Sequence, residues 1–72
     1  MIVSSLAVAG HPQRDGRSYV AETHLWSTGA VTRIEYGPVP DSTDYQAVAD
    51  ARARALELQA AVAEFEALTG GD

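Results

Sequence analysis

The chain contains no cysteine among its 72 residues, which excludes disulfide bonds as a source of stability. A domain of this length buries only about 60% of the surface that its unfolded chain exposes. Such small domains are usually reinforced by disulfides, by a bound metal or by association with another protein. The two histidines, His11 and His24, are isolated in the sequence and predict neither a metal site nor a cofactor. Association is therefore the reinforcement that we expect.

Basic residues are also scarce, with five against ten acidic residues and a net charge of −5. Basic and acidic groups balance over residues 1–40, so all of the excess acidity lies in residues 41–72. Proteins that bind nucleic acid normally carry a clustered basic surface that neutralises phosphates. The distribution argues against direct nucleic-acid binding and is compatible with a basic protein partner or with simple solubility.

Motifs of enzymatic chemistry are missing as well. The serines lack a G-x-S-x-G setting, and the separated glycines form no phosphate-binding loop. A Ser-His-acid triad would need three positions that converge on a cleft, which a chain of this size is not expected to form. We interpret Glu22 and His24, which share one strand face, as a surface polar pair, and Trp26 and Tyr36 as aromatics that close a small core. The sequence therefore predicts no catalytic residue and no enzyme.

The clearest feature that is present is a long helix over residues 43–69. No glycine or proline occurs from Ala47 to Ala67, where strong helix formers dominate. Several potential N-caps precede it, and Thr43 with Gln46 fits a T-x-x-Q capping box. Gly70 is a typical C-terminal stop signal. Charges occur throughout this segment, so we expect no membrane-spanning helix.

Two apolar stripes follow this helix when residues are placed about 100° apart around its axis. A surface helix of a monomer normally needs only one. The second stripe is mostly alanine, so it is either a consequence of helix propensity or a surface that packs on a second chain. The first stripe consists of Val48, Ala51, Ala55, Leu58, Val62 and Phe65, and the second of Tyr45, Ala49, Leu56, Ala60, Ala63 and Ala67.

The length of the helix strengthens the expectation of a partner. Twenty-six helical residues at about 1.5 Å each would reach roughly 39 Å, whereas strands of seven or eight residues span only about 25 Å. Part of the helix should overhang the sheet. If so, Leu58, Val62, Phe65 and Leu68 cannot all be buried within one chain.

The remainder of the sequence predicts three strands. Residues 1–10 form an apolar segment with no basic leader before it, which we interpret as a strand rather than a signal peptide. Residues 18–26 and 30–36 are rich in strand-forming types and are separated by Ser27-Thr28-Gly29, a three-residue hairpin loop. The predicted fold is α+β, a three-stranded antiparallel meander followed by one helix (βββα). It forms one domain, with the meander over 1–37, a joint over 38–42 and the helix over 43–69, and its outer strand edges are exposed.

The run DGRSYVAETH (Asp15 to His24), then Gly29, Tyr36 and a helix ending in EFEAL (Glu64 to Leu68), resembles a group of small uncharacterised proteins encoded by tailed bacteriophages. Their shared pattern is approximately D-G-R-x-[YW]-V-x-E-x-H, a glycine-centred hairpin and a C-terminal helix. Ser18 stands where a second arginine is common in that pattern. The resemblance implies a phage context, in which small proteins often occur as many copies in a virion.

These observations predict a non-enzymatic virion structural component, such as a small tail, neck or capsid-associated protein, that is made in the host cytoplasm. Its partners would be other virion proteins or copies of itself, with no nucleic acid or membrane. The alternatives are an acidic inhibitor or regulator of a host protein and an assembly chaperone that leaves before the particle matures. The predicted docking residues, beside an exposed sheet edge, are Tyr45, Val48, Leu56, Leu58, Val62, Phe65 and Leu68.

Overall fold

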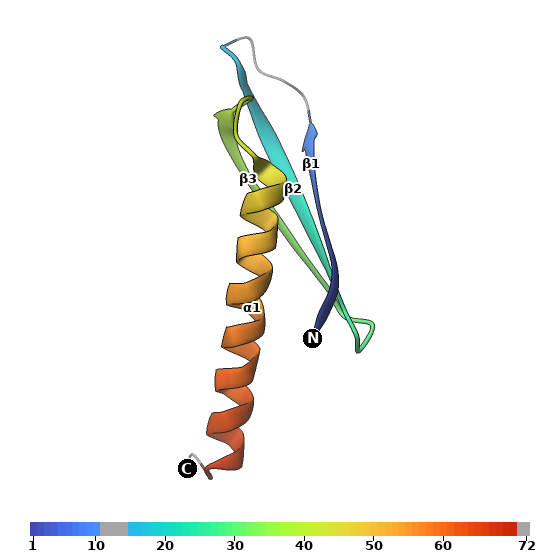
Figure 1. Cartoon of the computed structure of the whole chain (residues 1–72), viewed down its shortest axis with the longest axis vertical. Helices are drawn as coiled ribbons and strands as arrows, with labels where there is room; N and C mark the ends of the chain where they lie inside the picture. Colours follow the sequence, from blue (N-terminus) through green and yellow to red (C-terminus); the bar gives the residue numbers. More distant parts are fainter. Residues whose placement is uncertain (11–14, 71–72) are drawn as a thin grey trace.

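The computed structural model describes residues 1–10 and 15–70 and contains one antiparallel sheet followed by one helix (Figure 1). The strands lie in the order β1-β2-β3, so the predicted α+β arrangement βββα is confirmed. Gly29 adopts a φ of +90° in the turn between β2 and β3, as the hairpin signal predicts. The elements are β1 (Ile2–Gly10), β2 (Arg17–Trp26), β3 (Val31–Pro40) and α1 (Tyr45–Leu68).

Side chains alternate between the two faces of the sheet, and α1 covers only one face. On the central strand, Val20, Glu22 and His24 lie on the covered face and are buried. The helix packs on β1 and β2 rather than on β3, so the side chains of β3 on this face are only half-buried. The opposite face is open and carries the exposed side chains of Leu6, Val8, Tyr19, Leu25 and Val31.

The third strand is longer than the sequence predicts. The predicted meander ends at Gly37, whereas β3 continues to Pro40. Pro38 and Pro40 are tolerated because β3 is an edge strand, in which the outward-facing backbone groups need no partner. Pairing between β2 and β3 is irregular between Ser18 and Val20, and the strand resumes its pairing after this irregularity.

The start of the helix also differs from the expected one. Helix α1 begins at Tyr45 rather than at residue 43, and its N-cap is Asp44, whose carboxylate accepts a hydrogen bond from the Ala47 N–H at 3.1 Å. The predicted capping box between Thr43 and Gln46 is wrong, because the Gln46 side chain is engaged by β1. At the other end Gly70 has a φ of +73°, in agreement with the predicted stop signal.

Helix side chains cap the outer edge of β1. The Gln46 Oε1 atom accepts a hydrogen bond from the Ala7 N–H at 3.1 Å, and Gln46 Nε2 donates to the Ser5 carbonyl at 3.0 Å. The Glu57 carboxylate accepts from the Ile2 N–H at 3.0 Å. These side chains take the place of a fourth strand, so the edge of β1 that the sequence suggests to be open is partly occupied.

The hydrophobic core is very small. Its buried members are Ala7, Val20 and Ala49, one from each of three elements. Tyr45 packs against this cluster, so the stripe that contains Tyr45 and Ala49 faces the sheet. The other stripe, which begins at Val48, consequently turns away from it.

The predicted overhang of the helix is confirmed. Figure 1 shows the C-terminal turns of α1 extending past the end of the sheet, and every described residue after Glu57 is exposed. The side chains of Leu58, Val62, Phe65 and Leu68 are 66%, 47%, 65% and 80% exposed, respectively.

The molecule is elongated and exposes more surface than a compact monomer. Its radius of gyration is 15.1 Å, whereas a compact chain of this length would have about 11 Å. Its accessible surface is 5127 Å², and a typical folded monomer of 7.6 kDa would expose about 4,300 Å². The excess is about 800 Å².

Replacing Gly37 with alanine tests the irregular pairing. Gly37 has a φ of +134°, and a Cβ atom there would lie 3.0 Å from both the Ser18 carbonyl oxygen and the Tyr19 Cα. We expect Gly37→Ala to lower the free energy of unfolding by about 1–3 kcal/mol in urea titrations. Gly10→Ala is the matched control and should change stability far less, because the described residues place no atom within 4 Å of the position that its Cβ would occupy. Equal effects of the two variants would contradict this account.

Candidate functional site

A polar cluster lies buried between the sheet and the helix. Glu22 and His24 are both 0% exposed, although the sequence suggests a surface pair. The surface interpretation is wrong because α1 lies over this face of β2. Both side chains lie in the centre of the sheet and depend on partners within the protein.

His24 links the carboxylate to the first strand. Its Nε2 atom lies 3.0 Å from Glu22 Oε1, and its Nδ1 atom lies 2.7 Å from Ser5 Oγ. Both bonds are satisfied when Nε2–H donates to the carboxylate and Nδ1 accepts the Ser5 hydroxyl proton. Ser5 and His24 are register partners on β1 and β2, so the pairing of the strands itself brings them together.

Arg52 brings the balancing charge from the helix. Its Nε atom donates to Glu22 Oε1 at 2.7 Å, and its guanidinium lies 5.4 Å from the centre of the Tyr36 ring. The sequence patterns did not identify Arg52 as a partner of Glu22. Two signals were available. Glu22 interrupts a strand face next to Val20, and Arg52 lies between the two apolar stripes of the helix.

The environment shifts three acid-base equilibria. Burial alone would raise the pKa of the Glu22 carboxyl, but the hydrogen bonds from Arg52 and His24 and the charge of Arg52 outweigh burial and hold this pKa below its ordinary 4.5. Burial, together with the charge of Glu22, raises the pKa of Tyr36. The hydrogen bond to Glu22 raises the pKa of Arg52. The cluster is thus an ion pair at neutral pH.

Ser5, His24 and Glu22 form a hydrogen-bonded chain of the residue types found in catalytic triads, a convergence that the sequence does not predict. The order of the ring nitrogens is the reverse of that in the well-known Ser-His-Asp triad, where the acid binds Nδ1. The chain lies beneath the helix, and Glu22 is shared with Arg52. Its evident effect is to join β1, β2 and α1.

Metal ligands do not gather in the described part of the chain. Over residues 1–10 and 15–70, no group of three His, Asp or Glu side chains is placed to hold a metal ion. His11 lies outside the described residues. The expectation that the chain needs no cofactor stays a prediction.

The predicted docking residues separate into two groups. Tyr45 and Leu56 are half-buried on the side of the helix that faces the sheet, and Val48 is half-buried near the start of the helix. The members of the second group lie on the overhanging part and are exposed to solvent: Leu58, Val62, Phe65 and Leu68. Among the predicted docking residues, only the second group is exposed enough to offer a free surface to a partner.

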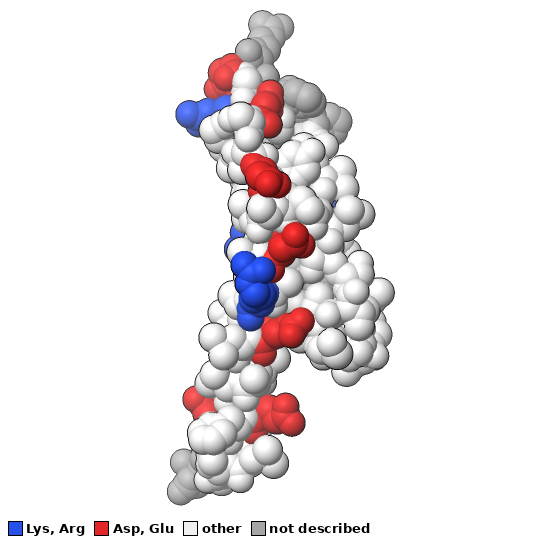
Figure 2. Space-filling model, viewed as in Figure 1, with Lys and Arg blue, Asp and Glu red and all other residues white. Residues whose placement is uncertain are grey.

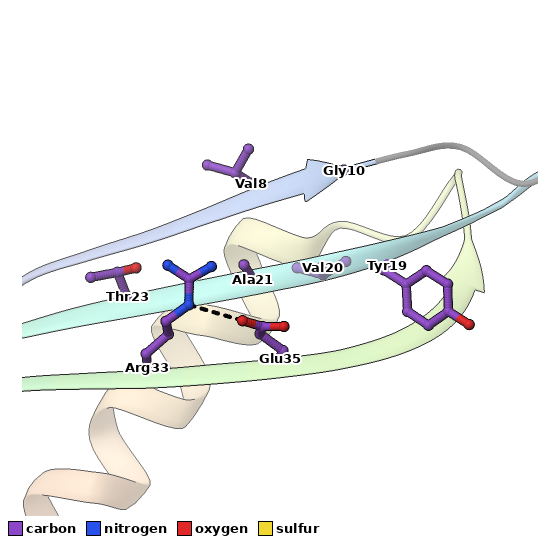
Figure 3. Close-up of a pocket in the computed structure, with 8 residues that line it drawn as sticks. All are labelled: Val8, Gly10, Tyr19, Val20, Ala21, Thr23, Arg33 and Glu35. Carbon is purple, nitrogen blue, oxygen red and sulfur yellow. Dashed lines mark hydrogen bonds and ion pairs between the residues drawn. The ribbon is translucent and has the colours of Figure 1, made fainter.

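The open face of the sheet is a second exposed apolar surface. A shallow depression of about 380 Å³ lies on it, and Figure 3 shows the Val8, Ala21 and Tyr19 side chains around it. An exposed ion pair crosses its border, with Arg33 Nε 3.0 Å from Glu35 Oε1. The depression is wide and open, so it resembles part of a contact surface more than a pocket for a small molecule.

Charged side chains are spread over the face of the molecule that Figure 2 shows. Figure 2 shows acidic side chains scattered along the molecule and basic side chains at a few places on the face shown. In the described part of the chain, α1 is not apolar over a long enough stretch to cross a membrane.

Comparison of the chain with models of protein families, with curated proteins and with solved structures finds no match. Function is therefore inferred from the surfaces and contacts described above.

Removal of the Arg52 side chain tests the role of the cluster. We expect Arg52→Leu to lower the free energy of unfolding by about 2 kcal/mol or more, because Glu22 would remain buried without its strongest partner. This figure is at the low end for buried pairs, since the Arg52 side chain is 35% exposed. Arg54→Leu is the control, because Arg54 is exposed on the same helix, and it should change stability by less than about 0.5 kcal/mol. If both variants unfold alike, the pair does not hold the helix.

The lowered pKa of Glu22 predicts an acid-sensitive contribution to stability. A carboxyl with a lower pKa in the folded state stabilises the protein above its unfolded pKa, and this contribution is lost as pH falls through the folded pKa. The free energy of unfolding should therefore decrease as pH falls below about 4.5. The decrease should be shallower in Glu22→Gln, as measured by denaturant titration from pH 7 to pH 3. Parallel curves for the two proteins would contradict the assignment.

Proposed function

We propose that the chain is a non-enzymatic structural component of a bacteriophage virion, such as a small tail, neck or capsid-associated protein. The observation that carries the proposal is the row of exposed apolar side chains on the overhanging part of α1, formed by Leu58, Val62, Phe65 and Leu68. Contiguous apolar surface of this kind usually marks a contact with another protein. The resemblance to small tailed-phage proteins supplies the phage context.

Three parts of the molecule support docking within an assembly. The overhanging helix would insert between neighbours, and the open sheet face adds further apolar surface. The outer edge of β3 is the sheet edge that would accept a neighbouring strand, since Gln46 and Glu57 already occupy part of the β1 edge. Partners would be virion proteins or further copies of the chain, with neither nucleic acid nor membrane involved. The protein would be made in the host cytoplasm and incorporated into the virion.

A second candidate is an acidic inhibitor or regulator that binds a host protein, favoured by the exposed carboxylates of Glu64 and Glu66. Charge reversal at these two residues would abolish such a complex. Glu57 is unsuitable for this test, because its carboxylate binds the Ile2 N–H and supports the fold. An assembly chaperone is a further alternative, and it would be present in assembly intermediates and absent from mature particles.

The direct test is quantitative mass spectrometry of purified particles of the encoding phage. We expect the chain at several copies per particle, in a constant ratio to a known structural protein after further purification. Its absence from mature particles would overturn the proposal. Presence in assembly intermediates alone would favour the chaperone alternative.

A variant separates docking from folding in the same particles. Val62→Glu should be lost from them while the free chain retains its helical circular-dichroism spectrum, because Val62 is 47% exposed within a single chain. The neighbouring Glu64→Gln is the control and should be incorporated normally. Normal incorporation of Val62→Glu would show that this surface is not used.

A further inference from the structure

We infer that the exposed stripe of α1 binds the same stripe of a second copy, as an antiparallel pair of helices related by a twofold axis. The inference deepens the proposed function and rests on it for its biological role, since it names what covers the docking surface. Five properties of the stripe support this pairing: its spacing, its direction, the match of its side-chain sizes, the charges beside it and its exposed area.

The spacing of the stripe is that of a coiled coil. Successive members are separated by three, four, three, four and three residues, as are the a and d positions of heptads. Val48 and Val62 occupy two of the a positions, and Leu58 and Phe65 occupy two of the d positions. The stripe consists of Val48, Ala51, Ala55, Leu58, Val62 and Phe65.

The stripe points away from the sheet of its own chain. At about 100° per residue, Leu58 lies roughly 180° around the helix from Ala49, which is fully buried in the core. Val62 and Phe65 lie within about 40° of that direction. A second helix can therefore lie along the stripe without contacting the sheet.

Side-chain sizes favour the antiparallel orientation. In the antiparallel register that pairs the two stripes end to end, Ala51 faces Val62 of the second copy, and Ala55 faces Leu58 of the second copy. Each small residue then faces a larger one, which fills space at the density of a protein interior. A parallel pair would instead stack two successive layers of alanine on alanine and leave voids, which are costly.

Charge favours the same orientation. Arg52 and Arg54 lie in the N-terminal half of α1, and Glu64 and Glu66 lie in its overhanging half. An antiparallel pair places the acidic half of one helix beside the exposed Arg54 of the other, while Arg52 stays paired with Glu22 of its own chain and Asp50 accepts a hydrogen bond from Gln46. The helix dipoles are also antiparallel in this orientation, so the positive end of each lies beside the negative end of the other.

The exposed area agrees with a dimer of ordinary size. The chain exposes about 800 Å² more than a compact monomer of its mass, and a stable interface buries about 800 Å² on each partner. A twofold interface uses the same patch on both copies, so each chain contributes one stripe to it. The open sheet face remains available to other proteins.

Sedimentation equilibrium of the full chain tests the inference. We expect twice the 7.6 kDa mass of one chain at micromolar concentrations. Leu58→Glu should raise the dissociation constant by at least about 100-fold, since a twofold interface would bury the new charge twice. Its circular-dichroism melt serves as the folding check. Leu6→Glu, which places the same charge on the open sheet face, is the matched control and should leave the dimer intact. A wild-type chain that is monomeric at 100 µM, or a dimer broken by Leu6→Glu and not by Leu58→Glu, would overturn the inference.

Single cysteines determine the orientation, because the natural chain has none. A mixture of Ala51→Cys and Val62→Cys should form a disulfide-linked heterodimer on oxidation, while each variant alone should not. In the antiparallel register, identical positions would be about 16 Å apart along the axis, well beyond the ~7 Å limit between Cα atoms of a disulfide. Efficient linkage of each variant to itself would indicate a parallel pair and overturn the antiparallel assignment.

Failure of the dimer and failure of the virion role are distinguishable. If the free chain is monomeric and Val62→Glu still prevents incorporation into particles, the stripe binds a different virion protein. That outcome would overturn the inference and leave the proposed function in place. If the chain dimerises through the stripe but is absent from mature particles, the inference stands and the proposed function is overturned.

Discussion

The ion pair between Glu22 and Arg52 is the contact on which the arrangement of this molecule depends. It joins the central strand to the helix at 2.7 Å, and His24 and Ser5 extend it to the first strand. Among the described residues, the apolar core beside it contains three buried residues, too few to fix the rotation of a 24-residue helix by themselves. A carboxylate buried at this position requires its arginine. The rotation that brings Arg52 to Glu22 Oε1 also turns the stripe containing Leu58 toward solvent.

The exposed stripe follows both from how the helix is held and from its length beyond the sheet. Over the sheet, the first stripe contributes Val48 and two alanines, whereas the second contributes Tyr45, Ala49 and Leu56, so apolar packing favours the same rotation as the ion pair. Ala49 is fully buried against the sheet, and Phe65 is exposed because the overhanging part of the helix has no sheet beneath it. The helix contacts the sheet through Ala49, Tyr45 and polar side chains, and its large apolar residues after Glu57 are exposed.

Sequence patterns predict the elements and their order well and the contacts between them poorly. The strand-forming residue types, the glycine in the hairpin and the helix with its stop at Gly70 are local signals, and each is confirmed. The cluster could not be located in this way, because Glu22 becomes buried only when a helix thirty residues later covers it. For the same reason the local pattern assigns Gln46 to a capping box, although this side chain binds β1. The sequence predicts too early an end for β3, because prolines that would interrupt a central strand are tolerated on an edge strand.

A double-mutant cycle on Glu22→Gln and Arg52→Leu, measured as free energies of unfolding at pH 7, tests the central claim most directly. If the pair holds the helix in place, the two changes should be coupled by at least about 1 kcal/mol, because the loss of either partner removes the same interaction. Additive effects, with a coupling energy near zero, would mean that other contacts orient the helix, and would contradict the claim that this ion pair turns the apolar stripe toward solvent.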